Sequence, residues 1–179
     1  MNCKNPYFFI LLLLFGCQDV PEQRQKNDIT YFDLRGYLEK EAARLSAASP
    51  VVSKTVSVND SSETKHIKIS DWSKELEIFR DADINKAAWK GMFKITKHQD
   101  TVEYMSNNEN IPVKKLKLYY QKNSNKTILQ GFQVIINNTN MLYNSTDTLL
   151  YYPDSLYQAK KSQDILLLSK KNYEVTGKF

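Results

Sequence analysis

Short runs of alternating apolar and polar residues fill the sequence from Ala88 onward, and they limit the possible folds more than any other feature. Polar turns rich in Asn, Ser and Asp separate these runs. Strands at roughly 10–15-residue spacing are typical of an antiparallel meander, because parallel βαβ units need a longer crossover. We expect strands near residues 89–95, 102–105, 116–120, 128–136, 141–152, 156–160, 164–169 and 172–176, with turns at 97–100, 123–126 and 137–140.

A helical pattern comes before these strands. Apolar residues recur at spacings of three and four between Tyr31 and Leu45, which predicts a helix over about residues 29–47. Asn27 or Asp28 can cap this helix, because either side chain can accept a hydrogen bond from a free N–H group of its first turn.

The segment between the helix and the strands predicts a hairpin and a second helix. Residues 51–58 and 64–69 alternate around a polar turn, and Ser70 or Asp71 can then cap a short helix that ends near Ala82. The predicted fold class is therefore α+β. An N-terminal helix, a hairpin and a short second helix pack on a curved antiparallel β-sheet, the meander.

The first sixteen residues have the composition of a signal peptide. Lys4 supplies a positive charge, residues 7–15 are an unbroken apolar run, and Gly16 precedes Cys17. The apolar run is too short for a membrane-spanning helix, which needs roughly 20 residues. Loss of Lys4 with this segment lowers the formal net charge from +5 to +4.

Leu14-Phe15-Gly16-Cys17 resembles the lipobox of bacterial lipoproteins: an aliphatic residue, a small residue directly before the cysteine, then the cysteine. The resemblance implies that Cys17 is diacylated, becomes the mature N-terminus and anchors the protein to a membrane. Three further stretches, residues 31–34, 71–85 and 140–145, resemble small envelope lipoproteins of Bacteroidota. Those families have no assigned activity, so the resemblance implies only an anchored helix-and-sheet domain in the cell envelope, at the outer membrane.

These observations divide the chain into three parts. Residues 1–16 are the predicted signal peptide, and residues 17–27 are the predicted lipidated cysteine and flexible tether. Residues 28–179 form the predicted single α+β domain. The tether prediction follows from its polar, Pro-containing composition without periodicity.

The cysteine count excludes thiol chemistry in this domain. The chain has two cysteines, of which Cys3 leaves with the signal peptide and Cys17 is the predicted acylation site. No thiolate is then left for a disulfide, a nucleophile or a metal. We therefore expect the domain to be stabilised by its apolar core, without a disulfide.

One segment has the opening pattern of a calcium loop. Asp81, Asp83 and Asn85 have the required spacing, but Lys86 occupies the position of the turn glycine and Met92 that of the closing glutamate. We therefore expect no metal at this segment. It is interpreted as the polar end of a helix, in which Asp83 and Asn85 cap backbone groups.

The sequence has no recognisable catalytic motif. His66 and His98 are the only histidines, and their spacing matches neither a zinc motif nor an acid–base pair. No nucleophile elbow or phosphate-binding glycine loop is present. The sequence therefore predicts a non-enzymatic protein without catalytic residues or cofactors.

Large aromatic residues of the meander are the remaining functional signal. They either form the core between sheet and helices or line a cavity for a lipid or small hydrophobic ligand. The candidate ligand-facing aromatics are Trp89, Phe93, Phe132, Tyr143 and Tyr151.

The lysines are scattered along the chain, so they predict a solvated face or a protected sheet edge, and no nucleic-acid partner.

The leading hypothesis is a lipid-anchored, non-catalytic envelope protein that binds another envelope component. The alternative is a carrier of a lipid or small hydrophobic ligand in a sheet-lined cavity.

Overall fold

The computed structural model describes residues 30–123 and 126–179. The predicted signal peptide, Cys17 and the tether lie outside the described residues. The helical segments are α1 (Leu34–Ala48), α2 (Trp72–Glu75), α3 (Glu77–Asp81) and the 3₁₀ turn η1 (Ala87–Trp89). The strands are β1 (Val51–Val58), β2 (Ser61–Lys68), β3 (Lys94–Lys97), β4 (Thr101–Met105), β5 (Val113–Asn123), β6 (Lys126–Asn140), β7 (Tyr143–Tyr152), β8 (Leu156–Ile165) and β9 (Lys171–Lys178).

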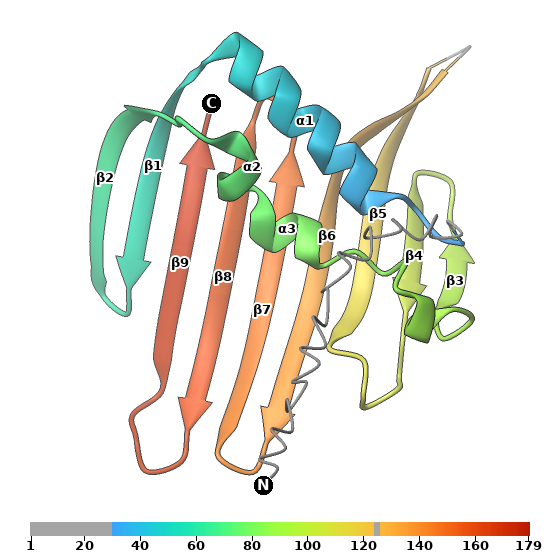
Figure 1. The fold of residues 1–179 in the computed structure, drawn as a ribbon, viewed down its shortest axis with the longest axis vertical. Helices are drawn as coiled ribbons and strands as arrows, with labels where there is room; N and C mark the ends of the chain where they lie inside the picture. Colours follow the sequence, from blue (N-terminus) through green and yellow to red (C-terminus); the bar gives the residue numbers. More distant parts are fainter. Residues whose placement is uncertain (1–29, 124–125) are drawn as a thin grey trace, which may run out of the picture.

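The nine strands form one open antiparallel sheet in the order β2-β1-β9-β8-β7-β6-β5-β4-β3 (Figure 1). Strands β3 to β9 follow one another as the predicted meander. The hairpin β1–β2 joins the same sheet through β9, where Val56 lies opposite Val175. The fold is broadly α+β, and the sheet dominates it.

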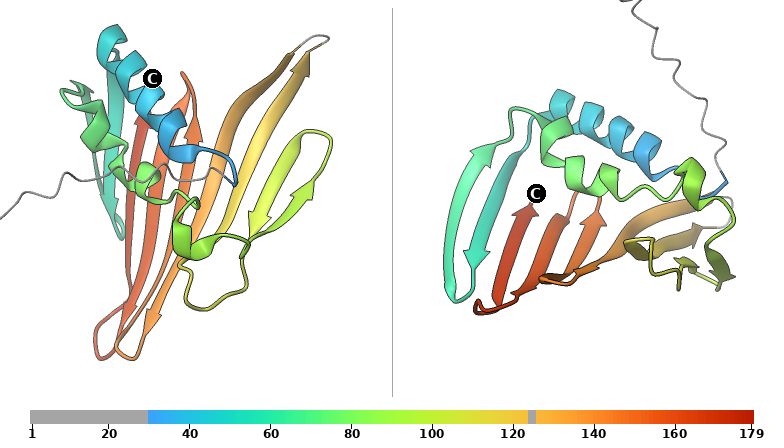
Figure 2. Two further views of the ribbon diagram at one scale, coloured as in Figure 1. Left: turned by 45° about the vertical axis from the view of Figure 1, so that its right-hand side comes forward. Right: turned by 60° about the horizontal axis from the view of Figure 1, so that its bottom comes forward.

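The helices lie on one face of the sheet, which bends around them (Figure 2). The predicted apolar stripe of α1 is buried in full, as Leu34, Leu38, Ala42 and Leu45 are at most 4% exposed. The α1 side chains pack on the middle strands, where the Tyr37 ring makes edge contacts with Phe132 and Tyr151. No helix of the described residues is long and apolar enough to cross a membrane.

The first helix begins later than predicted. Asp33 caps it, because its side chain accepts a hydrogen bond from the N–H of Gly36 at 2.8 Å. Tyr31 is buried before the helix begins, and its ring packs on Phe93 and Tyr104. Tyr31, which extended the apolar period of the predicted helix, therefore belongs to the segment that leads into α1.

The second predicted helix is two short helices joined at Leu76. Asp71, one of the two residues predicted as caps, caps α2, because its side chain accepts a hydrogen bond from the N–H of Lys74 at 3.0 Å. The predicted apolar face is also confirmed, since Trp72, Leu76 and Phe79 are at most 1% exposed.

Three strand predictions were wrong in detail. Trp89 belongs to the turn η1 and Gly91 has a φ of 78°, so β3 begins only at Lys94. Residues 137–140, predicted as a turn, continue β6, because they pair with residues 143–146 of β7 and the turn follows at 141–142. Residues 156–165 form the single strand β8 rather than two strands, and residues 166–169, predicted as strand, belong to the turn before β9.

Candidate binding groove

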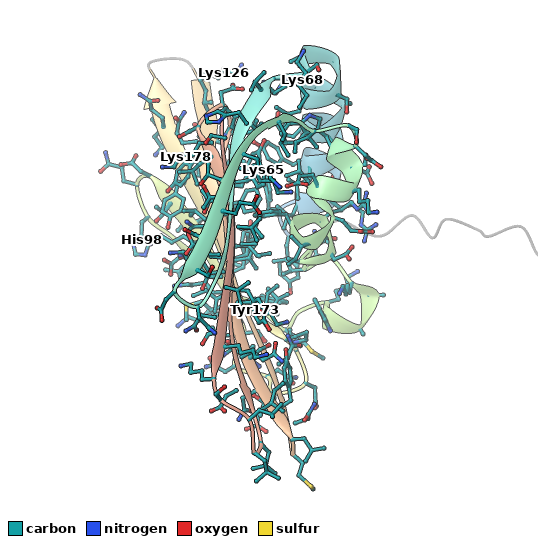
Figure 3. The ribbon with its side chains drawn as sticks, turned by 90° about the vertical axis from the view of Figure 1, so that its left-hand side faces the viewer. Lys65, Lys68, His98, Lys126, Tyr173 and Lys178 are labelled. Atoms are coloured by element: carbon teal, nitrogen blue, oxygen red, sulfur yellow. The ribbon has the colours of Figure 1, made fainter. Side chains whose placement is uncertain are left out.

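A hollow of about 550 Å³ lies between helices α2 and α3 and the strands β1, β2, β8 and β9. We call it the helix–hairpin groove. Its volume lies within the roughly 300–1,000 Å³ of ordinary small-molecule pockets. Figure 3 looks onto this edge of the sheet, with Lys65 and Lys68 of β2 toward the viewer.

Apolar side chains form most of the groove surface. Ala159 and Val175 lie opposite each other on β8 and β9, and Phe79 of α3 also lines the groove. Ile78 of α3 is 45% exposed at the opening, and Ile67 of β2 lines the other wall. A groove of this kind can bury an apolar ligand group or an apolar side chain of a partner.

An ion pair closes one part of the groove. Lys54 Nζ lies 2.6 Å from Glu75 Oε1, and the hydroxyl of Tyr157 donates to the same oxygen at 2.7 Å. Burial, and then the Glu75 carboxylate, raise the pKa of Tyr157, so its hydroxyl stays neutral and donates. The Glu75 carboxylate therefore has its partners within the protein.

The opening of the groove carries further charges. Lys68 and Lys74 are exposed there, and Asp71 is engaged in capping α2. Both acidic residues of the groove are thus hydrogen-bonded within the protein. The two exposed lysines leave the opening electropositive, which favours an anionic or polar group next to the apolar surface.

A second polar cluster lies farther along the same face of the sheet. Asp147 of β7 lies opposite Lys161 of β8, with Oδ2 and Nζ 3.6 Å apart. Tyr143, and also Asp147, raise the pKa of Lys161. Ser145 Oγ and Asp147 Oδ1 are buried and accept or donate no hydrogen bond within the described part of the chain. This cluster is separate from the groove lining.

The five aromatics predicted to face a ligand do not meet in one cavity. Phe132 and Tyr151 are 0% exposed and stack with ring centroids 5.5 Å apart, and Phe93 is 6% exposed. Trp89 packs at the edge of this core, with Lys86 Nζ 4.3 Å from its ring centroid. Tyr143 belongs to the polar cluster of β7 and β8. None of the five lines the helix–hairpin groove.

The residues weighed as metal or acid–base groups have other environments. His66 on β2 and His98 before β4 are both exposed, as expected of strand and turn residues. Within residues 30–123 and 126–179, no group of three or more metal-binding side chains comes together.

Asn85 caps backbone groups, as the interpretation of its segment predicted. Its Oδ1 accepts from the N–H of Tyr31 at 2.9 Å, and its Nδ2 donates to the carbonyl of Phe32 at 2.8 Å. Nδ2 also donates to Asp83 Oδ1 at 3.1 Å. The capped groups belong to the segment before α1 rather than to the adjacent helix, so Asn85 holds the chain that leads into α1.

The groove residues were missed in the sequence because they come from four separate segments. Lys54 of β1 and Glu75 of α2 are 21 residues apart in the sequence and are brought together by the fold. In comparisons with known proteins, the chain matches no protein family, no curated protein and no solved structure.

Proposed function

We propose that this chain is a lipid-anchored, non-catalytic protein of the cell envelope, and that its domain binds another envelope component in the helix–hairpin groove. Cys17 carries the anchor, residues 17–27 are the tether, and residues 28–179 act as one α+β unit. The outer membrane is the proposed location.

The observation that carries the binding role is the exposed apolar surface of the groove. Ile78 is 45% exposed beside an opening with two lysines, Lys68 and Lys74. Exposed apolar surface in a concave site with a polar rim is typical of binding sites. Glu75 is the acid deepest in the charged part of the groove, and its bonds to Lys54 and Tyr157 support a structural rather than a catalytic role.

The second candidate is a carrier of a lipid or small hydrophobic ligand. The apolar lining from Ile67 to Val175 and the volume of about 550 Å³ favour this function. In this variant of the proposal, the apolar part of the ligand contacts Phe79 and Ala159, and its polar end lies at Lys68 and Lys74. The occupant is then a small amphiphile instead of a protein.

A photocrosslinking amino acid at position 78 tests both candidates. Ile78 projects from α3 into the opening, so its replacement by p-benzoylphenylalanine reports what occupies the groove in intact cells. The matched control is the same amino acid at His66, which is exposed on β2 and outside the groove lining.

The two candidates predict different products. A discrete protein adduct at position 78 that is absent at position 66 supports binding of an envelope protein. An adduct with the mass of a lipid or other small molecule supports the carrier. Equal or absent crosslinking at both positions contradicts a binding role of the groove.

A further inference from the structure

Five large apolar side chains are exposed together at one end of the sheet. Two turns meet there, between β6 and β7 and between β8 and β9, at the lower end in Figure 1. The N–H of Leu166 donates to the carbonyl of Leu142 at 2.9 Å and joins the two turns. We call this group the leucine tip; its members are Met141 (93% exposed), Leu142 (60%), Leu166 (60%), Leu167 (95%) and Leu168 (61%).

The backbone of the tip is poorly suited to leucine. Leu167 has a φ of 68°, in the left-handed region that glycine and asparagine adopt at lower cost. A turn that only had to reverse the chain in water would favour those residues. Leucine in a strained and fully exposed position indicates that its side chain has a role outside the folded domain.

Basic side chains follow the tip directly. Lys170 and Lys171 are exposed, and neither forms an ion pair with a described residue. Asp164, near the end of β8, is the one acidic residue between Lys161 and Glu174. Leucines beside unpaired lysines match the chemistry of an anionic bilayer surface, with acyl chains below and negative headgroups above.

The shape of the tip favours a bilayer over a folded partner. Its apolar side chains project from two turns at the end of the sheet and leave the groove at the other end untouched. A protruding apolar turn can enter a fluid interface without a preformed pocket. Tyr143, directly after the turn, is the residue type enriched at the headgroup level.

We propose that the leucine tip inserts into the headgroup–acyl boundary of an anionic membrane and orients the domain on it. This inference rests on the proposed anchor at Cys17 for bringing the domain to the membrane. It does not depend on what the helix–hairpin groove binds.

The chain between the anchor and the domain is long enough for this contact. Tyr31, at the start of the described chain, packs on Tyr104, which shares a row of the sheet with Leu116 and Val134. Asn140 lies six residues beyond Val134 along β6, a rise of roughly 20 Å. The residues between Cys17 and Thr30 can span up to about 40 Å.

The test places an environment-sensitive fluorophore at the tip of the mature lipidated chain. Acylated Cys17 has no free thiol, so Leu167→Cys provides a single labelling site. The chain is reconstituted in vesicles of phosphatidylethanolamine and phosphatidylglycerol that contain lipids with a quencher at a known depth. His98→Cys is the matched control, because His98 is exposed in a turn away from the tip.

Insertion predicts a blue-shifted emission and quenching by shallow lipid quenchers at position 167, with neither effect at position 98. Emission typical of water at position 167 in vesicle-bound protein overturns the proposal and leaves the anchor intact. A blue shift without vesicles that grows with protein concentration assigns the tip to a second copy and also overturns it.

A mature chain with Cys17→Ser separates the tip from the anchor. With the same label at Leu167→Cys, this chain should partition weakly onto anionic vesicles with a blue shift. Replacing Lys170 and Lys171 by glutamine should weaken that partitioning about thirtyfold, because each lysine contributes to attraction by anionic headgroups. The double change Leu142→Ser, Leu166→Ser, with the label kept at position 167, should weaken the partitioning as well. Partitioning that responds to neither the lysine nor the leucine changes contradicts the proposal.

Discussion

Two tyrosine–glutamate hydrogen bonds hold the helices on the sheet. Tyr151 of β7 donates to Glu41 of α1 at 2.7 Å, and Tyr157 of β8 donates to Glu75 of α2 at the same distance. Burial raises the pKa of both tyrosines, so each remains a donor. Hydrogen bonds to a carboxylate are about twice as strong as neutral ones, and these two fix the height of the helices above the sheet.

Tyr157→Phe should lower the free energy of unfolding by about 1.5–3 kcal/mol, because it removes a hydrogen bond to a charged group while keeping the ring contact with Trp72. Urea denaturation with an unchanged m-value measures this loss. Tyr173→Phe is the control, since Tyr173 is half-buried on the neighbouring strand and should change stability little. Equal effects of the two substitutions would contradict the role of the Glu75 bond.

The buried carboxyl of Asp83 should make the free energy of unfolding depend on pH. Asp83 is 6% exposed, and burial raises the pKa of its carboxyl above 3.8, although the hydrogen bond from Asn85 acts in the opposite direction. Arg35 lowers this pKa and Asp33 raises it. A raised carboxyl pKa stabilises the fold at low pH, and that stabilisation is lost as the pH rises through the folded-state pKa.

Asp83→Asn should therefore raise the melting temperature at pH 7, because it removes a buried charge and retains an acceptor for Asn85. The difference from the wild type should shrink below pH 3.8, where the wild-type carboxyl is protonated in both states. Thermal melts across this pH range measure it. A variant that is less stable at pH 7 would show that the charge itself holds Asn85.

At the scale of single elements, β8 and β9 approach closely where Gly177 lies over the ring of Tyr157. A Cβ atom at position 177 would overlap the Tyr157 ring carbons, and this ring is 2% exposed and cannot move into solvent. The glycine therefore allows the tyrosine to cross the neighbouring strand and reach Glu75.

Gly177→Ala should cost about 1–3 kcal/mol of unfolding free energy, the range of overpacking in a dense core. It should also weaken the hydrogen bond between Tyr157 and Glu75. Chemical denaturation and the near-ultraviolet dichroism of the tyrosines report the two effects. Lys178→Ala, at the next and exposed residue, should remain within about 0.5 kcal/mol of the wild type.

The elements that depend on local pattern could be predicted from the sequence. The buried stripe of α1, the cap at Asp71 and the antiparallel succession of strands follow from periodicity and turn residues, which act over a few neighbours. The bounds of β6 and β8 were missed. The exact start of α1 was missed because Asp33 and Asp28 are both good caps, and the choice depends on the burial of Tyr31 against Phe93.

The candidate groove could not be predicted, because it depends on pairings between distant segments. Val56 lies opposite Val175, and nothing in the local pattern of either strand specifies that partner. The predicted aromatics Phe132 and Tyr151 were correctly recognised as sheet residues with large apolar area. Their position in the core follows from α1 and α3 covering that part of the sheet.

At the scale of the whole molecule, the sheet leaves two open edges, and both carry lysines. Lys65 and Lys68 lie on β2 at one edge, and Lys94 and Lys97 lie on β3 at the other. Charged side chains on edge strands oppose pairing with a second sheet. The molecule thus has protected edges, a groove between helices and hairpin, and the leucine tip at one end.

The central claim is that a lipid at Cys17 holds this domain on a membrane. Metabolic labelling with a fatty acid tests it most directly, with Cys3→Ser as the matched control, because Cys3 lies within the predicted signal peptide. The account predicts label on the wild type and on Cys3→Ser, and none on Cys17→Ser, which should keep its first sixteen residues and stay on the membrane. Label on Cys17→Ser, or no label on the wild type, would contradict the account.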